Sequence, residues 1–195
     1  IVLLAAENIM NESKRVINLS ENLLYLSSMR QQNITFKQHT VQSLMNDIKE
    51  STRIKRKQKE INLIINNHSN NIYGDIELLR SLFINLINNA TQASNNKTTI
   101  SIDANFNQEE LIISIKDEGK GIPKKELKKI REPFYRVDKA RSRHDGGTGL
   151  GLSICSQIVE LHKAKMIIES ELNKGTTISI IFTTPKQVLD KIETT

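Results

Sequence analysis

Apolar residues recur along this chain at two spacings, one typical of helices and one typical of strands. Helical spacing runs from residue 1 to about residue 30, returns near Val41, and is strongest after Asp75, a residue type that caps helices. The strongest stripe comprises Leu78, Leu79, Leu82, Phe83, Leu86, Ile87 and Ala90. A last helical stripe comprises Leu150, Ile154, Ile158 and Leu161. The pattern therefore predicts a long N-terminal helix and three further helices.

Strand-like segments lie between the helical ones. Apolar or alternating runs predict strands at 61–65, 99–106, 111–116, 166–169 and 176–182. The short link after residue 106 predicts a hairpin. The remaining expectations are a loop at 68–71, a short basic helix at 124–130, a turn at 173–175, and a solvated helix end for the basic run 53–59.

The composition suits a chain that buries a core, since 37% of its residues are hydrophobic. The formal net charge of +6 predicts an anionic partner, and leaves a nucleotide, a nucleic acid and an acidic protein open. Aromatic residues make up only 4%, which argues against a stacking platform for single-stranded nucleic acid. Cys155 lies in an apolar helical pattern and is expected in the core. No two histidines have metal-ligand spacing, and no apolar run reaches the length of a membrane span.

The densest glycine run, residues 145–152, leads directly into the last helical stripe. Glycine lets backbone N–H groups approach a bulky anion, and a helix N-terminus behind the loop adds unpaired donors. The run therefore predicts a phosphate cradle, although a plain turn accounts for the glycines about equally well. The long, basic link at about 122–147 has the character of a lid beside such a site.

Two further polar features accompany the predicted elements. Asn85 and Asn89 share one face of the helix after Asp75, where their amide oxygens could hold a hard cation, or simply reflect an Asn-rich chain. Asp117 ends a predicted strand and precedes Gly119 and Gly121. Its carboxylate could accept an exocyclic amine such as that of adenine, or lie solvated in a turn.

Four motifs stand in a fixed order and together resemble the ATP-binding catalytic domain of two-component sensor histidine kinases. Residues 85–90 resemble the N box of that family, 117–121 the G1 box, 132–136 the F box and 147–152 the G2 box. Residues 169–177 resemble its closing hairpin. The resemblance covers about residues 34–184, and it is specific because independent motifs agree in order and spacing.

The resemblance implies an α+β fold, a two-layer α/β sandwich in which helices cover a mixed sheet (the Bergerat, or GHKL, fold), preceded by the long N-terminal helix. It also implies that ATP and Mg²⁺ bind. The implied catalytic residues are Asn85, Asn89 and Arg136, with Asn89 as the Mg²⁺ ligand. The implied nucleotide-binding residues are Asp117, Gly119, Gly121, Ile122, Gly147, Thr148, Gly149, Leu150, Gly151 and Thr176.

Individual roles follow from the same resemblance. Asp117 is expected to accept from the adenine amino group, with Thr176 beside the base, and Arg136 to reach the terminal phosphate from the lid. Gln92 and Ala93 stand where Lys and Tyr are frequent in the family. A cation of the lid is therefore expected to replace that Lys.

Upstream, residues 11–27 resemble the second helix of the dimerisation and histidine-phosphotransfer domain. We therefore expect part of that domain at 1–32 and an ATP-binding domain at 33–195. Its first helix, which carries the phosphate-accepting histidine, has no counterpart here. The chain also begins without Met and in mid-pattern, so we expect it to belong to a longer protein.

The implied function is transfer of the γ-phosphoryl group of Mg-ATP to that histidine, for relay to an aspartate of a response regulator. Expected partners are ATP, the histidine-bearing dimerisation domain of the full-length chain, a response regulator and a second protomer, with no nucleic acid. The expected location is the cytoplasmic side of a membrane-anchored protein, and the chain alone is not expected to phosphorylate itself.

Two other classes remain open: a non-catalytic module that responds to ATP, and another ATPase of the same fold, such as an Hsp90-like chaperone. A basic nucleic-acid binder is a third reading, but the basic residues within 120–143 fit a phosphate-facing lid at least as well.

Overall fold

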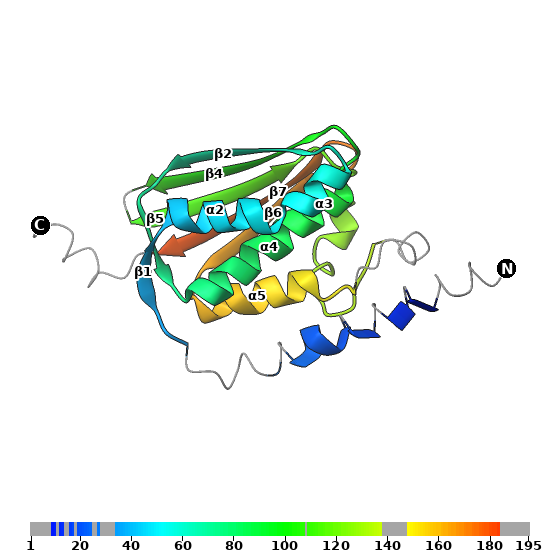
Figure 1. The fold of residues 1–195 in the computed structure, drawn as a ribbon, viewed down its shortest axis with the longest axis horizontal. Helices are drawn as coiled ribbons and strands as arrows, with labels where there is room; N and C mark the ends of the chain where they lie inside the picture. Colours follow the sequence, from blue (N-terminus) through cyan, green and yellow to red (C-terminus); the bar gives the residue numbers. More distant parts are fainter. Residues whose placement is uncertain are drawn as a thin grey trace, which may run out of the picture.

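The computed structural model describes residues 9–10, 12–13, 16–17, 19–24, 27, 34–107, 109–137 and 148–183, and predictions about other residues lie outside it. Within this part, α-helices cover one face of a five-stranded sheet, and a two-stranded sheet lies at one end (Figure 1). The predicted two-layer sandwich with a mixed sheet is confirmed.

The large sheet has the strand order β2-β4-β5-β7-β6. The strands are β2 Asn62–His68, β4 Thr99–Asn107, β5 Glu110–Asp117, β6 Lys165–Glu171 and β7 Gly175–Thr183. Only the β2–β4 pair is parallel among these neighbours, and β4 and β5 form the predicted hairpin. All five strands match predicted segments, and each is longer than predicted because strand pairing extends to polar end residues.

The small sheet pairs β1 (Lys37–Thr40) with β3 (Asn71–Gly74). Neither strand was predicted, and β3 begins inside the segment expected to be a loop at 68–71. Each is four residues long, too short to show a clear alternation. Their pairing depends on contact between residues more than thirty positions apart.

The helices are α2 Val41–Ser51, α3 Arg53–Gln58, α4 Ile76–Ala93 and α5 Gly151–Leu161. The predicted cap of α4 is confirmed, because Asp75 Oδ1 accepts hydrogen bonds from the backbone N–H groups of Glu77 (3.1 Å) and Leu78 (3.2 Å). The prediction of a short basic helix at 124–130 is wrong: the structure has one 3₁₀ turn, Lys124–Glu126, followed by turns.

The core lies between the sheet and the helices. The predicted stripe of α4 is buried from Leu78 to Ala90 and faces the inner side of β4 and β5, where Ile100, Ile102 and Ile113 are also buried. Cys155 lies in this core as predicted, and burial raises the pKa of its thiol. It therefore serves as a small apolar side chain.

The basic run 53–59 is not wholly a solvated helix end. Arg56 in α3 is only 7% exposed. Its Nη2 donates to the Lys49 carbonyl (2.8 Å) and its Nε to Thr52 Oγ1 (3.1 Å), so the guanidinium joins the end of α2 to α3. Burial lowers the pKa of this group, but its N–H donors lie in one fixed plane, so two of them reach the Lys49 carbonyl and Thr52 Oγ1 together.

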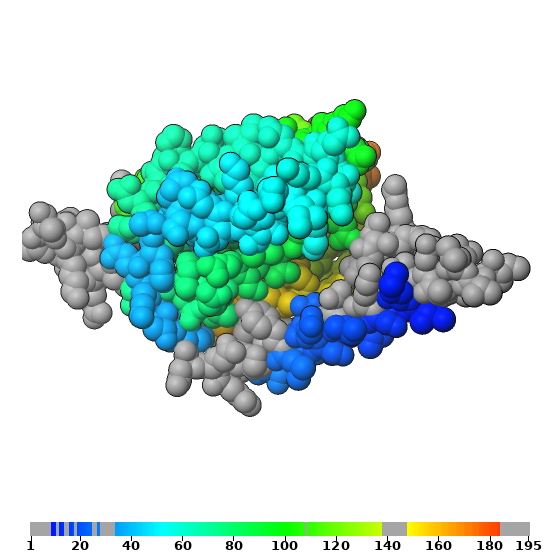
Figure 2. Space-filling view, viewed as in Figure 1, coloured from blue at the N-terminus to red at the C-terminus, as the bar shows by residue number. Residues whose placement is uncertain are grey.

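The described residues between 9 and 27 are helical, in agreement with part of the predicted N-terminal helix. In the space-filling view they lie beside the N-terminal end of α5 (Figure 2), and Leu19 packs against the core. The helices that the structure describes include none with the length and apolar character of a membrane span.

His162 closes the C-terminal end of α5. Its Nε2 accepts from the Asp75 backbone N–H (3.1 Å), so its Nδ1 carries the proton and donates to the Ile158 carbonyl (2.8 Å). The ring also lies 5.0 Å from Phe36 and 6.3 Å from Phe182, centroid to centroid. Burial lowers the pKa of His162, although the bond to Ile158 and the charge of Asp75 oppose this. The fold therefore requires neutral His162.

The first prediction concerns stability as the pH falls below 6.5. Because the folded pKa of His162 lies below its ordinary value of 6.5, the unfolded chain binds the proton first as the pH falls. The contribution of His162 to the free energy of unfolding is therefore complete well above pH 6.5. It declines as the pH falls below that value, by at most about 1.4 kcal/mol per pH unit. In His162→Gln, urea unfolding should show a shallower decline. His68→Gln, which alters an exposed histidine, should leave the slope unchanged; an identical slope for His162→Gln would contradict the assignment.

Candidate functional site

A cavity of about 490 Å³ opens between α4, the start of α5, the end of β5 and the start of β7. That volume lies within the range of about 300–1,000 Å³ usual for small-molecule sites. Ten of the predicted site residues line it: Asn85, Asn89, Asp117, Gly121, Ile122, Arg136, Thr148, Gly149, Gly151 and Thr176. Residues from distant parts of the chain therefore meet in one place.

The remaining predicted residues have other positions. Gly119 does not line the cavity, but its N–H holds Asp117. The Leu150 side chain is fully buried in the core. Gly147, with residues 138–146 of the expected lid, lies outside the described part of the chain.

Asp117 is a buried acceptor at the end of β5, with 6% of its surface exposed. Its Oδ1 accepts from the backbone N–H groups of Gly119 (2.8 Å) and Thr176 (3.2 Å). Burial raises the pKa of this carboxyl, while the two N–H donors oppose the rise. Among the described residues none donates to Oδ2, so this oxygen is available to a donor in the cavity that Asp117 lines.

Gly175 allows β7 to begin directly against Asp117. It has φ of 108°, and a methyl group added there would lie 1.9 Å from the Asp117 carbonyl oxygen. No other residue fits that approach. As a result Thr176 pairs with Asp117 in the β5–β7 register, and both residues line the cavity.

Asn85 and Asn89 direct their amide groups to one point at the start of α5. Asn85 Nδ2 donates to the Ser81 carbonyl (2.9 Å) in its own helix. A methyl group added at Gly151 would lie 3.3 Å from Asn85 Oδ1 and 3.5 Å from Asn89 Oδ1. The two oxygens thus converge where α5 begins.

The N-terminus of α5 adds backbone donors at the same point. The first N–H groups of a helix have no intrahelical partners, and no side chain caps those of α5. This end of the helix forms part of the cavity wall, through Thr148, Gly149, Gly151 and Leu152. An uncapped helix N-terminus favours anions, as the phosphate-cradle interpretation requires.

The C-terminus of α4 is held by a lysine that the sequence did not single out for this task. Lys59 Nζ donates to the carbonyls of Thr91 (2.9 Å), Gln92 (3.2 Å) and Ser94 (3.0 Å). The Lys120 N–H donates to the Ala93 carbonyl (3.2 Å). These bonds attach the end of α4 to the loop after Asp117.

Phe134 connects the F-box segment to the glycine loop. Its N–H donates to the Gly149 carbonyl (3.0 Å). Phe134 has φ of 66°, an uncommon value for a residue with a side chain, and the residue is 54% exposed. Nearby, Tyr135 donates to Glu126, which raises the pKa of the tyrosine. The start of the expected lid is therefore joined to the loop that lines the cavity.

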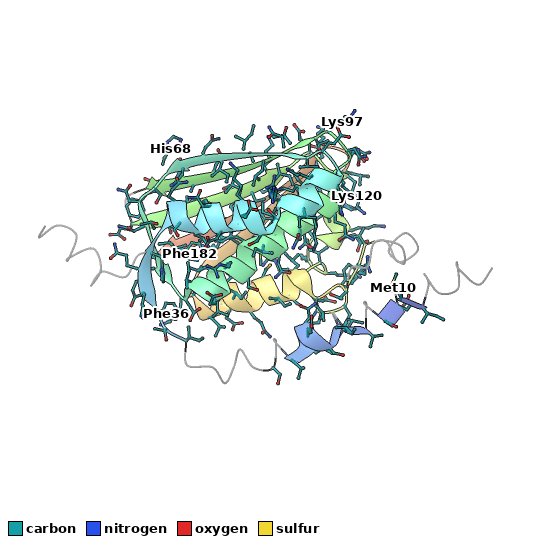
Figure 3. All side chains as sticks on the ribbon, in the orientation of Figure 1. Met10, Phe36, His68, Lys97, Lys120 and Phe182 are labelled. Carbon is teal, nitrogen blue, oxygen red and sulfur yellow. The ribbon has the colours of Figure 1, made fainter. Side chains whose placement is uncertain are left out.

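Other residues that line the cavity were missed as site residues. Lys55 of α3 and Lys120 add positive charge to that of Arg136, while Glu21 adds negative charge. Lys120 is labelled at the α3 end of the molecule in Figure 3, opposite Phe36 and His68. Asn22 Nδ2 donates to Thr148 Oγ1 (3.5 Å), so the N-terminal segment reaches the cavity as well. Lys120 lies within the G1 box, but no local motif marks Glu21, Asn22 or Lys55, because only the packing of α3 and the N-terminal segment brings them to the cavity.

The residues suit a nucleotide with a cation. The described residues form no group of three or more His, Cys, Asp or Glu that could hold a metal ion by itself. Amide oxygens such as those of Asn85 and Asn89 suit Mg²⁺ when phosphate oxygens complete its coordination. The remaining features, a buried carboxylate at one end and backbone donors with cations at the other, fit a base and phosphates.

Comparison with known proteins places the chain in a family. Residues 74–187 match the model of the histidine kinase-, DNA gyrase B-, and HSP90-like ATPases. The chain belongs to this ATPase family, which accounts for the mixed sheet and for the order of the four motifs.

Relatives narrow the resemblance to sensor kinases. The chain is 40% identical over 184 residues to the sensor histidine kinase WalK of Bacillus subtilis (strain 168), a match that covers 90% of the chain and 29% of WalK. It is 32% identical over 181 residues to the sensor protein SrrB of Staphylococcus aureus (strain NCTC 8325 / PS 47), covering 91% of the chain and 31% of SrrB. The chain is thus homologous to sensor histidine kinases and spans less than a third of these two relatives.

Solved structures agree on the fold. The Acinetobacter baumannii histidine kinase AdeS matches with a TM-score of 0.76 at 19% identity, over 94% of this chain and 85% of that one. Histidine kinase ThkA, in complex with response regulator protein TrrA, matches with a TM-score of 0.75 at 22% identity, over 92% of this chain and 50% of that one. The predicted Bergerat fold and its resemblance to sensor histidine kinases are confirmed.

The second prediction concerns Asp117. In Asp117→Asn an N–H donor faces the cavity in place of the carboxylate Oδ2, while Oδ1 can still hold Gly119 and Thr176. Affinity for ATP should fall about 10- to 100-fold, the effect of losing a hydrogen bond to a charged acceptor. Affinity for inorganic tripolyphosphate should not change. Calorimetric titration measures both, and equal losses for the two ligands would contradict a role for Asp117 at the base.

Proposed function

We propose that this chain is the catalytic part of a two-component sensor histidine kinase, which binds Mg-ATP and transfers the γ-phosphoryl group to a histidine on another helix. The observation that carries the proposal is the meeting of Asp117, Asn89, Arg136 and Gly151 in one cavity. The ATPase family supports ATP as the ligand, and the sensor kinase relatives support a protein histidine as acceptor.

The base would lie at the sheet end of the cavity. Asp117 Oδ2 would accept from the exocyclic amine, with Thr176 beside the ring and Gly121 and Ile122 as the neighbouring wall. Burial keeps water from competing for this hydrogen bond, so the bond is worth more than it would be on the surface.

The phosphates would lie at the start of α5. Backbone N–H groups of Thr148, Gly149 and Gly151 would donate to them, and Arg136 would lie near the terminal phosphate. Mg²⁺, when bound, would neutralise phosphate charge, with Asn89 as a ligand and Asn85 beside it. Phosphoryl transfer depends mainly on such positioning and charge stabilisation, so the chain needs no nucleophile of its own.

The acceptor and partners follow from the same proposal. Residues 1–32 would belong to a dimerisation and phosphotransfer domain and residues 33–195 to the ATP-binding domain, with a lid at about 122–147. The full-length protein would form a homodimer, carry the acceptor histidine, and pass the phosphoryl group to a response regulator. We place the domain on the cytoplasmic side of a membrane-anchored sensor.

Calorimetric titration with ATP, with and without Mg²⁺, tests ligand binding, and GTP serves as control. Binding that prefers ATP and strengthens with Mg²⁺ is the expected result. Radiolabelled ATP and a separately supplied histidine-bearing hairpin of the full-length protein then test transfer. Binding without transfer would favour the alternative, a non-catalytic module that responds to ATP.

The third prediction concerns Asn89. In Asn89→Asp, a carboxylate replaces an amide that converges with Asn85 on Gly151, so it repels the phosphates and lacks the N–H donor. Affinity for Mg-ATP should fall about tenfold or more. Asn107→Asp makes the same change at an exposed position at the end of β4 and should bind normally. Unchanged affinity in Asn89→Asp would contradict its role at the phosphates.

A further inference from the structure

Ser170 in β6 does not line the cavity, but it contacts two segments that do. Its Oγ lies 2.8 Å from the Ile122 backbone nitrogen and 2.9 Å from the Gly175 carbonyl oxygen. It also lies 2.9 Å from Thr176 Oγ1. One hydroxyl therefore connects the loop after Asp117 to the start of β7.

The three contacts determine where each proton lies. A backbone N–H can only donate and a carbonyl oxygen can only accept, so Ser170 accepts from Ile122 and gives its single proton to Gly175. The proton in the bond between the two hydroxyls must then come from Thr176. Ser170 thus uses its one proton and both lone pairs.

Toward the cavity, Thr176 Oγ1 can therefore only accept hydrogen bonds. Its Oγ1 proton is engaged by Ser170, while its backbone N–H is engaged by Asp117 Oδ1. Asp117 offers a further acceptor through Oδ2. The base end of the cavity therefore presents two hydrogen-bond acceptors side by side, from residues that pair in the β5–β7 register.

Two acceptors distinguish ligands by the edge that they present. An exocyclic amino group, as in adenine, brings hydrogens to them, whereas the carbonyl oxygen at the same position of guanine brings only lone pairs. A Thr176 hydroxyl that was free to rotate would point its proton at that oxygen and accommodate it.

We propose that Ser170 is a positioning residue for base selectivity, because it engages the Thr176 proton and so makes Thr176 Oγ1 an acceptor toward the bound base. The inference rests on the proposed nucleotide function of the cavity and adds to it a determinant that does not touch the ligand.

Ser170→Ala tests the inference. Without the Ser170 hydroxyl, the Thr176 proton is free to donate to the guanine carbonyl. The ratio of ATP affinity to GTP affinity should fall about tenfold, the usual range for one hydrogen bond between uncharged groups. Affinity for inorganic tripolyphosphate should stay unchanged, since the phosphates lie at the other end of the cavity. Calorimetric titration with the three ligands measures each quantity.

Three variants serve as controls. Ser170→Thr keeps the hydroxyl and should retain the wild-type ATP:GTP ratio. Ser179→Ala removes a hydroxyl from β7 that bonds to Ser114 at 2.8 Å, outside the cavity, and should leave the ratio unchanged. Thr176→Val removes the acceptor itself and should lower the ratio. In the Thr176→Val background, Ser170→Ala should change it no further.

The outcomes separate this inference from the proposed function. A wild-type ATP:GTP ratio in Ser170→Ala, or equal losses for all three ligands, would overturn the role of Ser170 without contradicting ATP as the ligand of the unaltered chain. Failure of the unaltered chain to bind ATP would contradict the proposed function and this inference with it. If Ser170→Ala does not fold, as thermal unfolding would show, an unchanged ratio in Thr176→Val overturns the inference.

Discussion

The site depends on one constraint: helix α4 has a fixed orientation about its own axis. Leu79, Leu82 and Phe83 are fully buried, so the helix has one stable orientation against the sheet. Turning any of these side chains to solvent would cost about 1.5–3 kcal/mol each. Because residues four apart share a helix face, the same burial orients Asn85 and Asn89 toward Gly151. The hydrophobic core therefore also positions the polar wall of the cavity.

The other end of the cavity depends on the register of β5 and β7. Burying the Asp117 carboxylate is unfavourable by itself, and N–H donors from Gly119 and Thr176 offset part of that cost. The Thr176 donor is available only when Gly175 lies against the Asp117 backbone, an approach that a methyl group would prevent. The β5–β7 pairing, Gly175 and the buried Asp117 carboxylate thus depend on one another. Ser170 then fixes the direction of the Thr176 hydroxyl proton.

Much of the architecture was predictable from local patterns. The Asp75 cap, the α4 stripe, the core position of Cys155 and the β4–β5 hairpin all follow from periodicity and turn chemistry, and each is confirmed. The four-residue strands of the small sheet carried no such pattern. Arg56 looked like one more solvated cation, because nothing local shows that its guanidinium closes the end of α2.

Amino-acid order alone was enough to define the long helices, the strands of the large sheet, the order of the four motifs and the chemistry each one offers, because capping, periodicity and glycine flexibility act over a few residues. Folding in three dimensions decided which of those groups meet. It brought Lys55 and Asn22 to the cavity and set the Thr176 proton toward Ser170. Such contacts join residues that are remote along the chain or on neighbouring strands, and they exist only once the core has packed and the strands have paired.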